Sequence, residues 1–182
     1  MPNMEETVTS SKRLFDGRIL NLRVDTVVLP NGKMSQREIV EHRGAVAMIP
    51  MLDRETVILV RQYRRAAGGL LLEIPAGTRD HEEPWEDCAR RELAEEINYQ
   101  PGRLVKLFHS YQSPGYCTEV IHTFLALDLT PAEGHTDEDE FLEIVPMPFA
   151  EAIEKIKTGE IVDAKTISGL LFAARLLPDL EF

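Results

Sequence analysis

The segment between Pro84 and Asn98 places the strongest constraint on how this chain folds. It contains no Gly or Pro, and the good helix formers Ala, Leu, Glu and Arg dominate it. Pro84 suits the first turn of a helix, where its missing N–H costs nothing. Ala89, Leu93 and Ile97 recur at helical spacing and form one apolar stripe. The sequence therefore predicts an amphipathic helix that ends at Asn98, a residue type that tolerates the left-handed conformation of a helix C-terminus.

Acidic residues occupy the helix face next to this stripe. Glu92 and Glu96 lie one turn apart, so their carboxylates converge, and Glu95 is adjacent. Carboxylates at this spacing repel one another unless a cation is present, and all-oxygen ligands suit Mg²⁺ or Mn²⁺ rather than Zn²⁺. Two interpretations are open: a divalent-cation site, or a solvated acidic face that pairs with Arg90 and Arg91.

The residues ahead of the helix favour the cation site. Gly77 would allow a tight turn between a strand and a loop, and Glu83 is placed to bond Arg91 and orient the helix. The whole segment resembles the Nudix box, the signature of hydrolases that cut nucleoside diphosphates linked to another group. The matching positions are Gly77, Glu83, Arg91, Glu92, Leu93, Glu95 and Glu96. The one departure is Asn98, where the box has Gly.

Composition narrows the class of protein. A chain of 182 residues is the size of one domain with a large core. No apolar run is long enough to span a bilayer, and the N-terminus lacks a signal-peptide pattern. The net charge of −11 argues against non-specific nucleic-acid binding, and two cysteines outside a CxxC arrangement indicate the reducing cytoplasm. We therefore expect a cytoplasmic protein that binds neither membranes nor nucleic acid.

Hydrophobic patterning predicts strands, then the helix, then more strands and two final helices. Strands are expected at 8–15, 18–29, 33–42, 45–50, 56–60, 104–108, 118–126 and 141–145, and helices at 150–157 and 164–176. Pro30-Asn31-Gly32 predicts a hairpin turn, and the buried runs 45–50 and 56–60 are expected to form a hairpin. Asp163 is expected to cap the last helix.

This order indicates an α+β or α/β sandwich. The resemblance implies an α/β fold of the Nudix type: an α/β/α sandwich with a mixed β-sheet and an N-terminal antiparallel β-hairpin region. Residues 1–43 would be N-terminal strands exchanged in a homodimer, and residues 44–182 the Nudix hydrolase domain.

Further motifs resemble the bacterial ADP-ribose pyrophosphatase branch, which includes enzymes for GDP-mannose and other nucleoside diphosphate sugars. They are Arg-Gln-Tyr-Arg at 61–64, Leu-Glu-Ile-Pro-Ala-Gly at 72–77, Ser-Pro-Gly at 113–115 and Asp-Glu-Asp-Glu at 137–140. Pro114 matches the proline that ADP-ribose enzymes carry beyond the box. This resemblance implies a small-molecule nucleoside diphosphate sugar as substrate and Mg²⁺, or Mn²⁺, as cofactor.

The resemblance also implies roles for individual residues. The implied metal ligands are the Ala76 carbonyl, Glu92, Glu96, Glu95 and Glu140, and the implied catalytic residues are Glu138 as general base, Glu95 and Arg91. Neighbouring acids leave the register of residues 137–140 open, and a solvated acidic loop is the alternative there.

The substrate contacts implied by the resemblance lie elsewhere in the chain. Arg64 would grip the phosphates, since its fork geometry suits phosphate oxygens; the alternative is a surface arginine. Arg18 and Ile19 would touch the base from the neighbouring subunit, Glu38 would hydrogen-bond it, and Gly115 would let the loop approach the sugar.

Several polar and aromatic residues outside the box receive structural interpretations. Glu73 is expected to pair with a basic group near the sheet edge, or to be a plain strand residue. His122 is interpreted as a core or half-exposed histidine, His109 as a surface residue, and Trp85 as a packing residue.

Two classes of function remain. The leading hypothesis is an enzyme that cleaves ADP-ribose, to AMP and ribose 5-phosphate, or another nucleoside diphosphate sugar. The rival within this class is a hydrolase specific for GDP-mannose or a related GDP-, UDP- or ADP-sugar. The other class is a non-catalytic nucleotide-sugar sensor, against which the intact box carboxylates and the lack of a basic domain speak.

Overall fold

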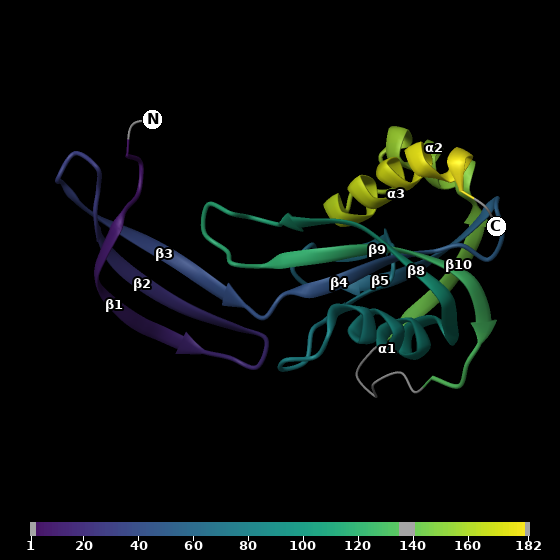
Figure 1. Ribbon diagram of the computed structural model, residues 1–182, viewed down its shortest axis with the longest axis horizontal. Helices are drawn as coiled ribbons and strands as arrows, with labels where there is room; N and C mark the ends of the chain where they lie inside the picture. The colour runs from purple at the N-terminus through teal and green to yellow at the C-terminus, as the bar shows by residue number, and fades with distance from the viewer. Residues whose placement is uncertain (1–2, 135–140, 181–182) are drawn as a thin grey trace. The chain divides into compact units, whose positions relative to one another are not determined.

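The computed structural model describes residues 3–134 and 141–180. The chain divides into two compact units. The first comprises Met1–Gly44 and Ser110–Val120, and the second comprises Ala45–His109 and Ile121–Phe182. Figure 1 shows the course of the chain through both.

The first unit is built on a three-stranded antiparallel sheet. Its strands are β1 (Thr7–Asp16), β2 (Leu20–Val28) and β3 (Met34–His42), in that order across the sheet. Gly32, with φ +81°, closes the turn between β2 and β3, because this left-handed backbone favours glycine. The Leu29 N–H donates to the Lys33 carbonyl at 2.8 Å. The antiparallel N-terminal region and its hairpin turn are confirmed.

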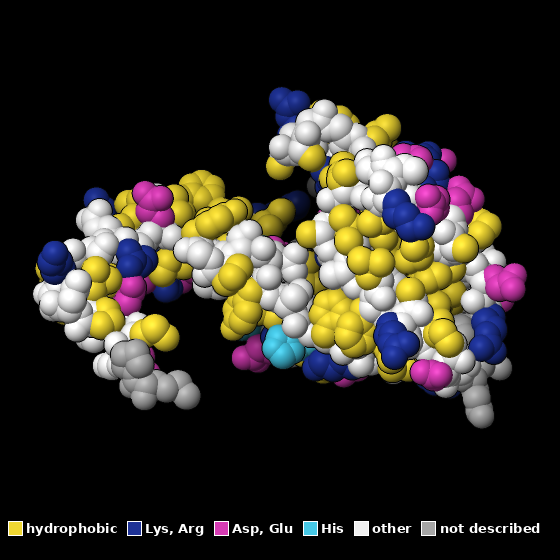
Figure 2. Space-filling view, turned by 90° about the horizontal axis from the view of Figure 1, so that it is seen from above, with side chains coloured by type: hydrophobic (Ala, Val, Ile, Leu, Met, Phe, Trp, Pro, Cys, Tyr) yellow, Lys and Arg dark blue, Asp and Glu magenta, His cyan; other side chains and the backbone are white. Residues whose placement is uncertain are grey.

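This sheet has almost no core within its own unit. Every residue of β1 is exposed, and among the described residues of the three strands only Asp25 and Val27 are buried. The segment 110–120 adds one partner to β3, where Val40 N–H donates to the Tyr116 carbonyl at 2.7 Å. Figure 2 shows hydrophobic side chains at the surface of this unit.

The second unit contains two sheets. One has the order β7-β4-β9-β8 and the other β10-β5-β6. The strands are β4 (Ala45–Pro50), β5 (Thr56–Arg64), β6 (Gly69–Glu73), β7 (Ala76–Thr78), β8 (Tyr99–Tyr111), β9 (Val120–Pro131) and β10 (Leu142–Pro148). Because β4 pairs in parallel with β9 and antiparallel with β7, the first of these sheets is mixed, as expected.

Helices cover both sides of these strands, α1 (Trp85–Ile97) on one side and α2 (Phe149–Thr158) and α3 (Ala164–Leu176) on the other (Figure 1). A short 3₁₀ helix, Leu177–Asp179, follows α3. The sequence prediction of an α/β/α sandwich is confirmed. No helix in the described part of the chain is long and apolar enough to cross a membrane.

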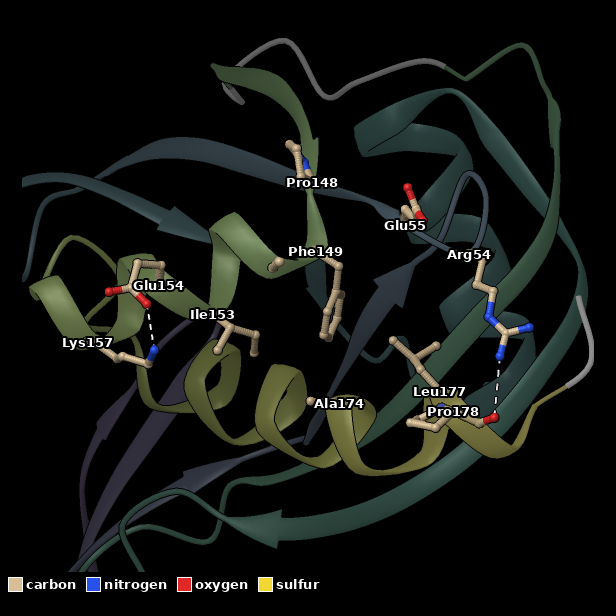
Figure 3. Close-up of a pocket in the computed structure, with 11 residues that line it drawn as sticks. Arg54, Glu55, Pro148, Phe149, Ile153, Glu154, Lys157, Ala174, Leu177 and Pro178 are labelled. Carbon is tan, nitrogen blue, oxygen red and sulfur yellow. Dashed lines mark hydrogen bonds and ion pairs between the residues drawn. The ribbon is translucent and has the colours of Figure 1, made fainter.

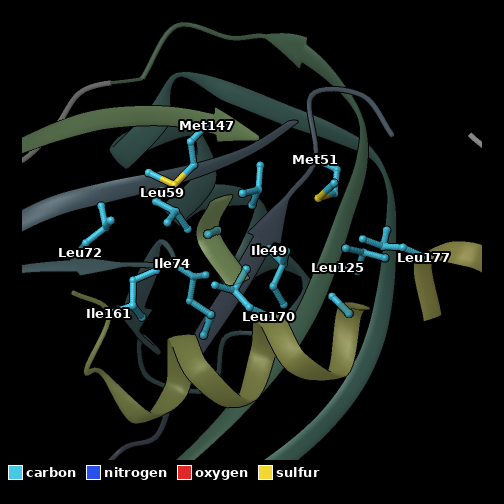
Figure 4. Close-up of a cluster of buried hydrophobic side chains, with 14 of the residues drawn as sticks. Ile49, Met51, Leu59, Leu72, Ile74, Leu125, Met147, Ile161, Leu170 and Leu177 are labelled. Atoms are coloured by element: carbon cyan, nitrogen blue, oxygen red, sulfur yellow. The ribbon is translucent and has the colours of Figure 1, made fainter. Parts of the chain in front are cut away.

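Strand β4 joins the two hydrophobic clusters of the second unit, because its side chains alternate between its faces. Ala47 and Ile49 pack in the cluster on the α3 side, with Leu170 among their neighbours (Figure 4). Val46 and Met48 pack in the other cluster, which contains the apolar stripe of α1. All six residues of β4 are therefore buried, and α1 is held directly on the sheet.

The helix ends follow the sequence. Asn98 closes α1 with φ +60° and ψ +38°, the left-handed conformation expected there. Asp163 caps α3 by accepting a 2.9 Å hydrogen bond from the Thr166 N–H. Both cap predictions are confirmed.

The predicted hairpin of residues 45–50 and 56–60 is wrong. An isolated bridge between Met51 and Val57 marks the turn, but β4 then pairs with β7 and β9, and β5 with β6 and β10. Strands that are buried on both faces have similar apolar sequences, so the sequence pattern does not reveal which strands pair with each other. The short strands β6 and β7 are not among the strands that patterning predicts, although the sequence allowed Glu73 to be a strand residue and placed Gly77 next to a strand.

Candidate active site

The carboxylates of α1 lie against strand β7. Glu92 and Glu96 are only 8% and 4% exposed, and Glu96 Oε2 accepts a hydrogen bond of 3.0 Å from the Ala76 N–H. A Cβ at Gly77 would stand 1.8 Å from Cδ of Glu92. Two neighbouring residues of β7 thus face the two carboxylates that the sequence placed one turn apart.

The reason for glycine at position 77 differs from the expected one. Gly77 lies inside β7, not in a tight turn, and its φ is outside the left-handed range. What requires glycine is space, because the carboxylate of Glu92 occupies the volume of a Cβ. The requirement arises from the packing of α1 against β7, which local sequence does not encode.

Arg91 links the acids of the box. Its Nε and Nη2 donate to the two carboxylate oxygens of Glu83 at 3.1 and 2.9 Å. Its Nη1 donates to Glu92 at 2.7 Å and to Glu95 at 2.9 Å. The hydrogen bond from Arg91 lowers the pKa of Glu83, and that same bond raises the pKa of Arg91. The pairing of Glu83 with Arg91 is present as the sequence suggested.

The side chains of this site fit a hard divalent cation. Glu92, Glu95 and Glu96 offer only oxygen, and Gly77 leaves the Glu92 carboxylate close to the main chain of β7. Among residues 3–134 and 141–180, no three Asp, Glu, His or Cys side chains already converge as a ligand set. Arg91 engages Glu92 and Glu95 in this arrangement.

A second ion-pair group centres on the buried Glu73. Arg64 donates to both of its oxygens at 2.8 Å, and Lys165 also pairs with it. Burial opposes the ionisation of Glu73, but Arg64 and Lys165 outweigh it and lower its pKa. The hydrogen bond with Glu73 raises the pKa of Arg64, and the charge of Glu96 adds to this effect. Glu73 thus has the basic partner that the sequence suggested.

The sequence does not predict the role of Lys165, because 92 residues separate it from Glu73. It also pairs with Asp163 at 2.9 Å, so the N-terminal cap of α3 belongs to the same group. The only local indication in the sequence is that Lys165 lies two residues after the capping residue Asp163. Glu73 therefore has one basic partner before it in the sequence, Arg64, and one far after it, Lys165.

A pocket of about 520 Å³ opens beside Glu96. Its lining residues are Arg61, Leu70, Glu96, Asn98, Phe141, Leu142, Glu143 and Ile144. The acidic helix therefore borders a cavity large enough for a small molecule.

A larger pocket of about 780 Å³ lies between α2, α3 and the turn at Arg54 (Figure 3). None of the predicted site residues lines it. Lys157 pairs with Glu154 at 2.6 Å, and Arg54 donates to the Pro178 carbonyl at 3.4 Å. We assign it no part in the site.

The predicted base- and sugar-binding residues belong to the first unit. Arg18 and Ile19 line a pocket of about 160 Å³ that also contains His42. Glu38 is exposed on β3, four residues from His42 and roughly 13 Å away at the rise of a strand. A Cβ at Gly115 would meet nothing within 4 Å, so the chain itself does not require glycine there.

Glu138 and Glu140 lie outside the described residues. On either side of them, Gly134 packs against the main chain of Ala94 in α1, and Phe141 lines the pocket beside Glu96.

The three aromatic residues singled out in the sequence lie together. Trp85 and His122 stack with ring centres 4.0 Å apart, and His109, which is exposed, lies 5.5 Å from His122. Burial lowers the pKa of His122, with Lys106 and His109 adding to the effect. Packing of Trp85 and the half-exposed position of His122 agree with their structural interpretations.

Fold and site together define an α/β/α sandwich in which an acidic helix lies against the mixed sheet. The sequence matches the NUDIX domain over residues 41–170 and the nucleoside diphosphate sugar hydrolase N-terminal domain over residues 6–40. The chain belongs to the Nudix family, whose hydrolases generally need divalent metal ions.

Curated relatives are similar over most of the chain. The ADP-ribose pyrophosphatase of Bacillus subtilis (strain 168) is 40% identical over 168 residues, which cover 91% of each chain. The methanol dehydrogenase activator of Bacillus methanolicus is 39% identical over 90% of this chain and 89% of its own. A GDP-mannose pyrophosphatase of Escherichia coli (strain SMS-3-5 / SECEC) is 42% identical over 72% of this chain and 74% of its own.

A solved structure has the same fold. The crystal structure of an ADP compounds hydrolase superimposes with a TM-score of 0.86 at 24% identity, covering 96% of this chain and 95% of that one.

Proposed function

We propose that this Nudix hydrolase cleaves the pyrophosphate bond of ADP-ribose, or of a related nucleoside diphosphate sugar, to a nucleoside monophosphate and a sugar phosphate. The observation that carries the proposal is the pair of buried carboxylates, Glu92 and Glu96, set against β7 beside a pocket of about 520 Å³. Similarity to an ADP-ribose pyrophosphatase over 91% of each chain supports the substrate class.

The proposed cation site comprises Glu92, Glu96, the assisting Glu95 and the Ala76 carbonyl, with Mg²⁺ or Mn²⁺ as the ion. When bound, such an ion lowers the pKa of water and neutralises charge that develops on phosphate. Arg91 holds the carboxylates of Glu92 and Glu95 in place, with bonds of 2.7 and 2.9 Å. Glu138 as general base and Glu140 as a further ligand stay predictions of the resemblance.

Arg64 is the proposed phosphate clamp. Its guanidinium is oriented by two bonds to Glu73. Its pKa is raised mainly by Glu73, with the negative charge of Glu96 on the acidic helix adding to the effect. A preorganised cation of this kind stabilises negative charge on transferring phosphoryl groups. Arg18, Ile19, Glu38 and Gly115 remain proposed contacts to the base and sugar.

A phosphatase-coupled phosphate-release screen tests this function. ADP-ribose, GDP-mannose, UDP-glucose, NADH, diadenosine polyphosphates and dGTP would each be offered with Mg²⁺ and with Mn²⁺. Turnover of ADP-ribose is expected, and turnover of GDP-mannose alone would favour the alternative suggested by the GDP-mannose pyrophosphatase relative. If folded protein releases phosphate from none of these compounds with either ion, the non-catalytic sensor is favoured.

The carboxylate variants identify the site. Glu96→Gln is expected to lower kcat by orders of magnitude while the fold survives, because it removes a buried carboxylate of the proposed cation site. Glu138→Gln is expected to bind metal yet turn over slowly. If Glu140→Gln is the inactive variant with intact metal affinity, the roles of these two acids are exchanged.

We also propose a homodimer formed through the first unit, in the reducing cytoplasm that two free cysteines suit. A three-stranded sheet with both faces of β1 exposed needs a further surface to bury its apolar side chains. Leu14 on β1 is 52% exposed, and Leu171 on α3, at 50%, provides a matched control. Light scattering is expected to show a dimer that Leu14→Glu weakens and Leu171→Glu leaves intact; a monomeric wild-type protein would contradict this.

A further inference from the structure

Arg79, Trp85 and His122 form a stacked group at the start of α1. The guanidinium carbon of Arg79 lies 4.4 Å from the centre of the Trp85 ring. The ring centres of Trp85 and His122 lie 4.0 Å apart, with an angle of 9° between the ring planes. A guanidinium over an indole is attracted by the ring quadrupole, and stacked aromatic rings fix each other's orientation. The Arg79 side chain is therefore held on a platform that β9 supports through His122.

From this platform Arg79 reaches the loop that carries Glu83. Its Nε–H donates to the Glu83 carbonyl at 2.6 Å. The preceding residue, Glu82, has φ +62°, a left-handed conformation that is strained for a residue with a side chain. The bond from Arg79 holds the main chain directly after this strained residue, where the loop would otherwise relax.

Glu83 connects this loop to the acidic helix α1 through its hydrogen bonds with Arg91. Its carboxylate takes both Nε–H and Nη2–H of Arg91, whose third nitrogen binds Glu92 and Glu95. The position of the Glu83 main chain thus sets the position of the Arg91 fork, and the fork sets two carboxylates of the proposed cation site.

We propose that Arg79 is a positioning residue for this site: stacked on Trp85, it fixes the Glu83 main chain and, through Arg91, the carboxylates of Glu92 and Glu95. This inference rests on the proposed function for the identity of the cation site. Arg79 itself touches neither substrate nor ion in this role.

Calorimetric titration with Mn²⁺ alone tests the inference without substrate. Arg79→Ala is expected to bind Mn²⁺ about tenfold more weakly, the scale at which groups behind metal ligands act. Arg79→Lys keeps the cation on Trp85 but loses the planar fork, so its affinity should be intermediate. Wild-type affinity in Arg79→Ala would overturn the proposal, and Arg79→Lys carries the test if the alanine variant fails to fold.

A double-mutant cycle separates positioning from general stabilisation. If Arg79 acts through Glu83, then Arg79→Ala combined with Glu83→Gln should bind Mn²⁺ within about twofold of Glu83→Gln alone. If the losses of Mn²⁺ affinity in the two single variants multiply in the double variant, Arg79 acts independently of Glu83, and the proposal is overturned.

Trp85 is the only tryptophan of the chain, so its fluorescence reports this group directly. Arg79→Ala is expected to shift its emission while circular dichroism stays unchanged. The matched control is Arg175→Ala, an exposed arginine on α3, which should keep both the wild-type emission and the wild-type Mn²⁺ affinity. Unchanged emission in Arg79→Ala would contradict the stacking that the proposal requires.

Failure of the inference and failure of the proposed function are distinguishable. If the wild-type protein binds Mn²⁺ but hydrolyses no nucleoside diphosphate sugar, the proposed function fails, and the titrations still decide the role of Arg79. If it hydrolyses ADP-ribose and Arg79→Ala matches it in turnover and Mn²⁺ affinity, the inference fails alone. Wild-type protein that binds no Mn²⁺ would overturn both.

Discussion

Glu73, only 1% exposed in its side chain, accepts two parallel 2.8 Å hydrogen bonds from Arg64. A buried carboxylate is stable as an anion only when it is paired, and here Lys165 pairs with it as well. The pair fixes the plane of the guanidinium, so the direction in which Arg64 presents its remaining donors is set before a substrate arrives.

We expect Glu73→Gln to loosen the proposed phosphate clamp. One charged partner is lost, so Arg64 is less well oriented, and KM for ADP-ribose should rise about tenfold with a smaller change in kcat. Steady-state kinetics on the variant provide the measurement. Glu154→Gln breaks an exposed pair with Lys157 on α2 and should leave both constants unchanged. Equal kinetics for both variants would contradict the orienting role.

Gly77→Ala should disturb the site far more than its size suggests. The added Cβ would stand 1.8 Å from Cδ of Glu92, so the carboxylate must move. We expect weaker Mn²⁺ binding and a loss of stability of about 1–3 kcal/mol, typical of overpacking. Gly69→Ala is the control, because a Cβ at Gly69 meets nothing within 4 Å. Chemical denaturation and metal titration compare the two, and a Gly77→Ala protein that matches Gly69→Ala would refute the close approach.

Acid should destabilise the protein in part through Glu83. Arg91 lowers the pKa of this carboxyl, so its contribution to stability is present above its unfolded pKa of about 4.3 and is lost as the pH falls through the lower folded value. The Tm of the wild-type protein should therefore fall more steeply below pH 5 than the Tm of Glu83→Gln. Parallel Tm–pH curves for the two proteins would show that the pair contributes nothing.

Cys88 should resist alkylation in the folded protein. Burial, together with the charge of Glu83, raises the pKa of its thiol to about 12, so the reactive thiolate is scarce at pH 8. Cys117 is partly exposed and should react first. Mass spectrometry after iodoacetamide treatment is expected to find Cys117 modified alone, and both cysteines modified in denatured protein. Labelling of Cys88 in the native state would mean that α1 opens readily.

The features predicted well from sequence were those encoded locally. The apolar stripe of α1, the left-handed Asn98 and the cap at Asp163 depend on residues within a few positions of each other, and all three were found as expected. Capping and amphipathicity are properties of a short segment, so the sequence specifies them directly.

The features that were missed depend on distant partners. The pairing of β4 with β9 instead of β5 is a choice among equally apolar strands. Lys165 meets Glu73 across 92 residues, and Trp85 of α1 stacks on His122 of β9. No spacing rule connects such residues, and Gly77 shows that even a correctly chosen residue can be required for a reason that only packing reveals.

The burial of β4 has a consequence for synthesis on the ribosome. Its run Ala45–Pro50 is wholly apolar, and its parallel partner β9 leaves the ribosome roughly 75 residues later, which takes several seconds at ordinary elongation rates. During that interval the nascent chain exposes a strand suited to aggregation. Pro50 at its end and the charged turn of residues 53–55 are the gatekeepers that the chain places there. We therefore expect the speed of translation between these two strands to affect the yield of folded protein.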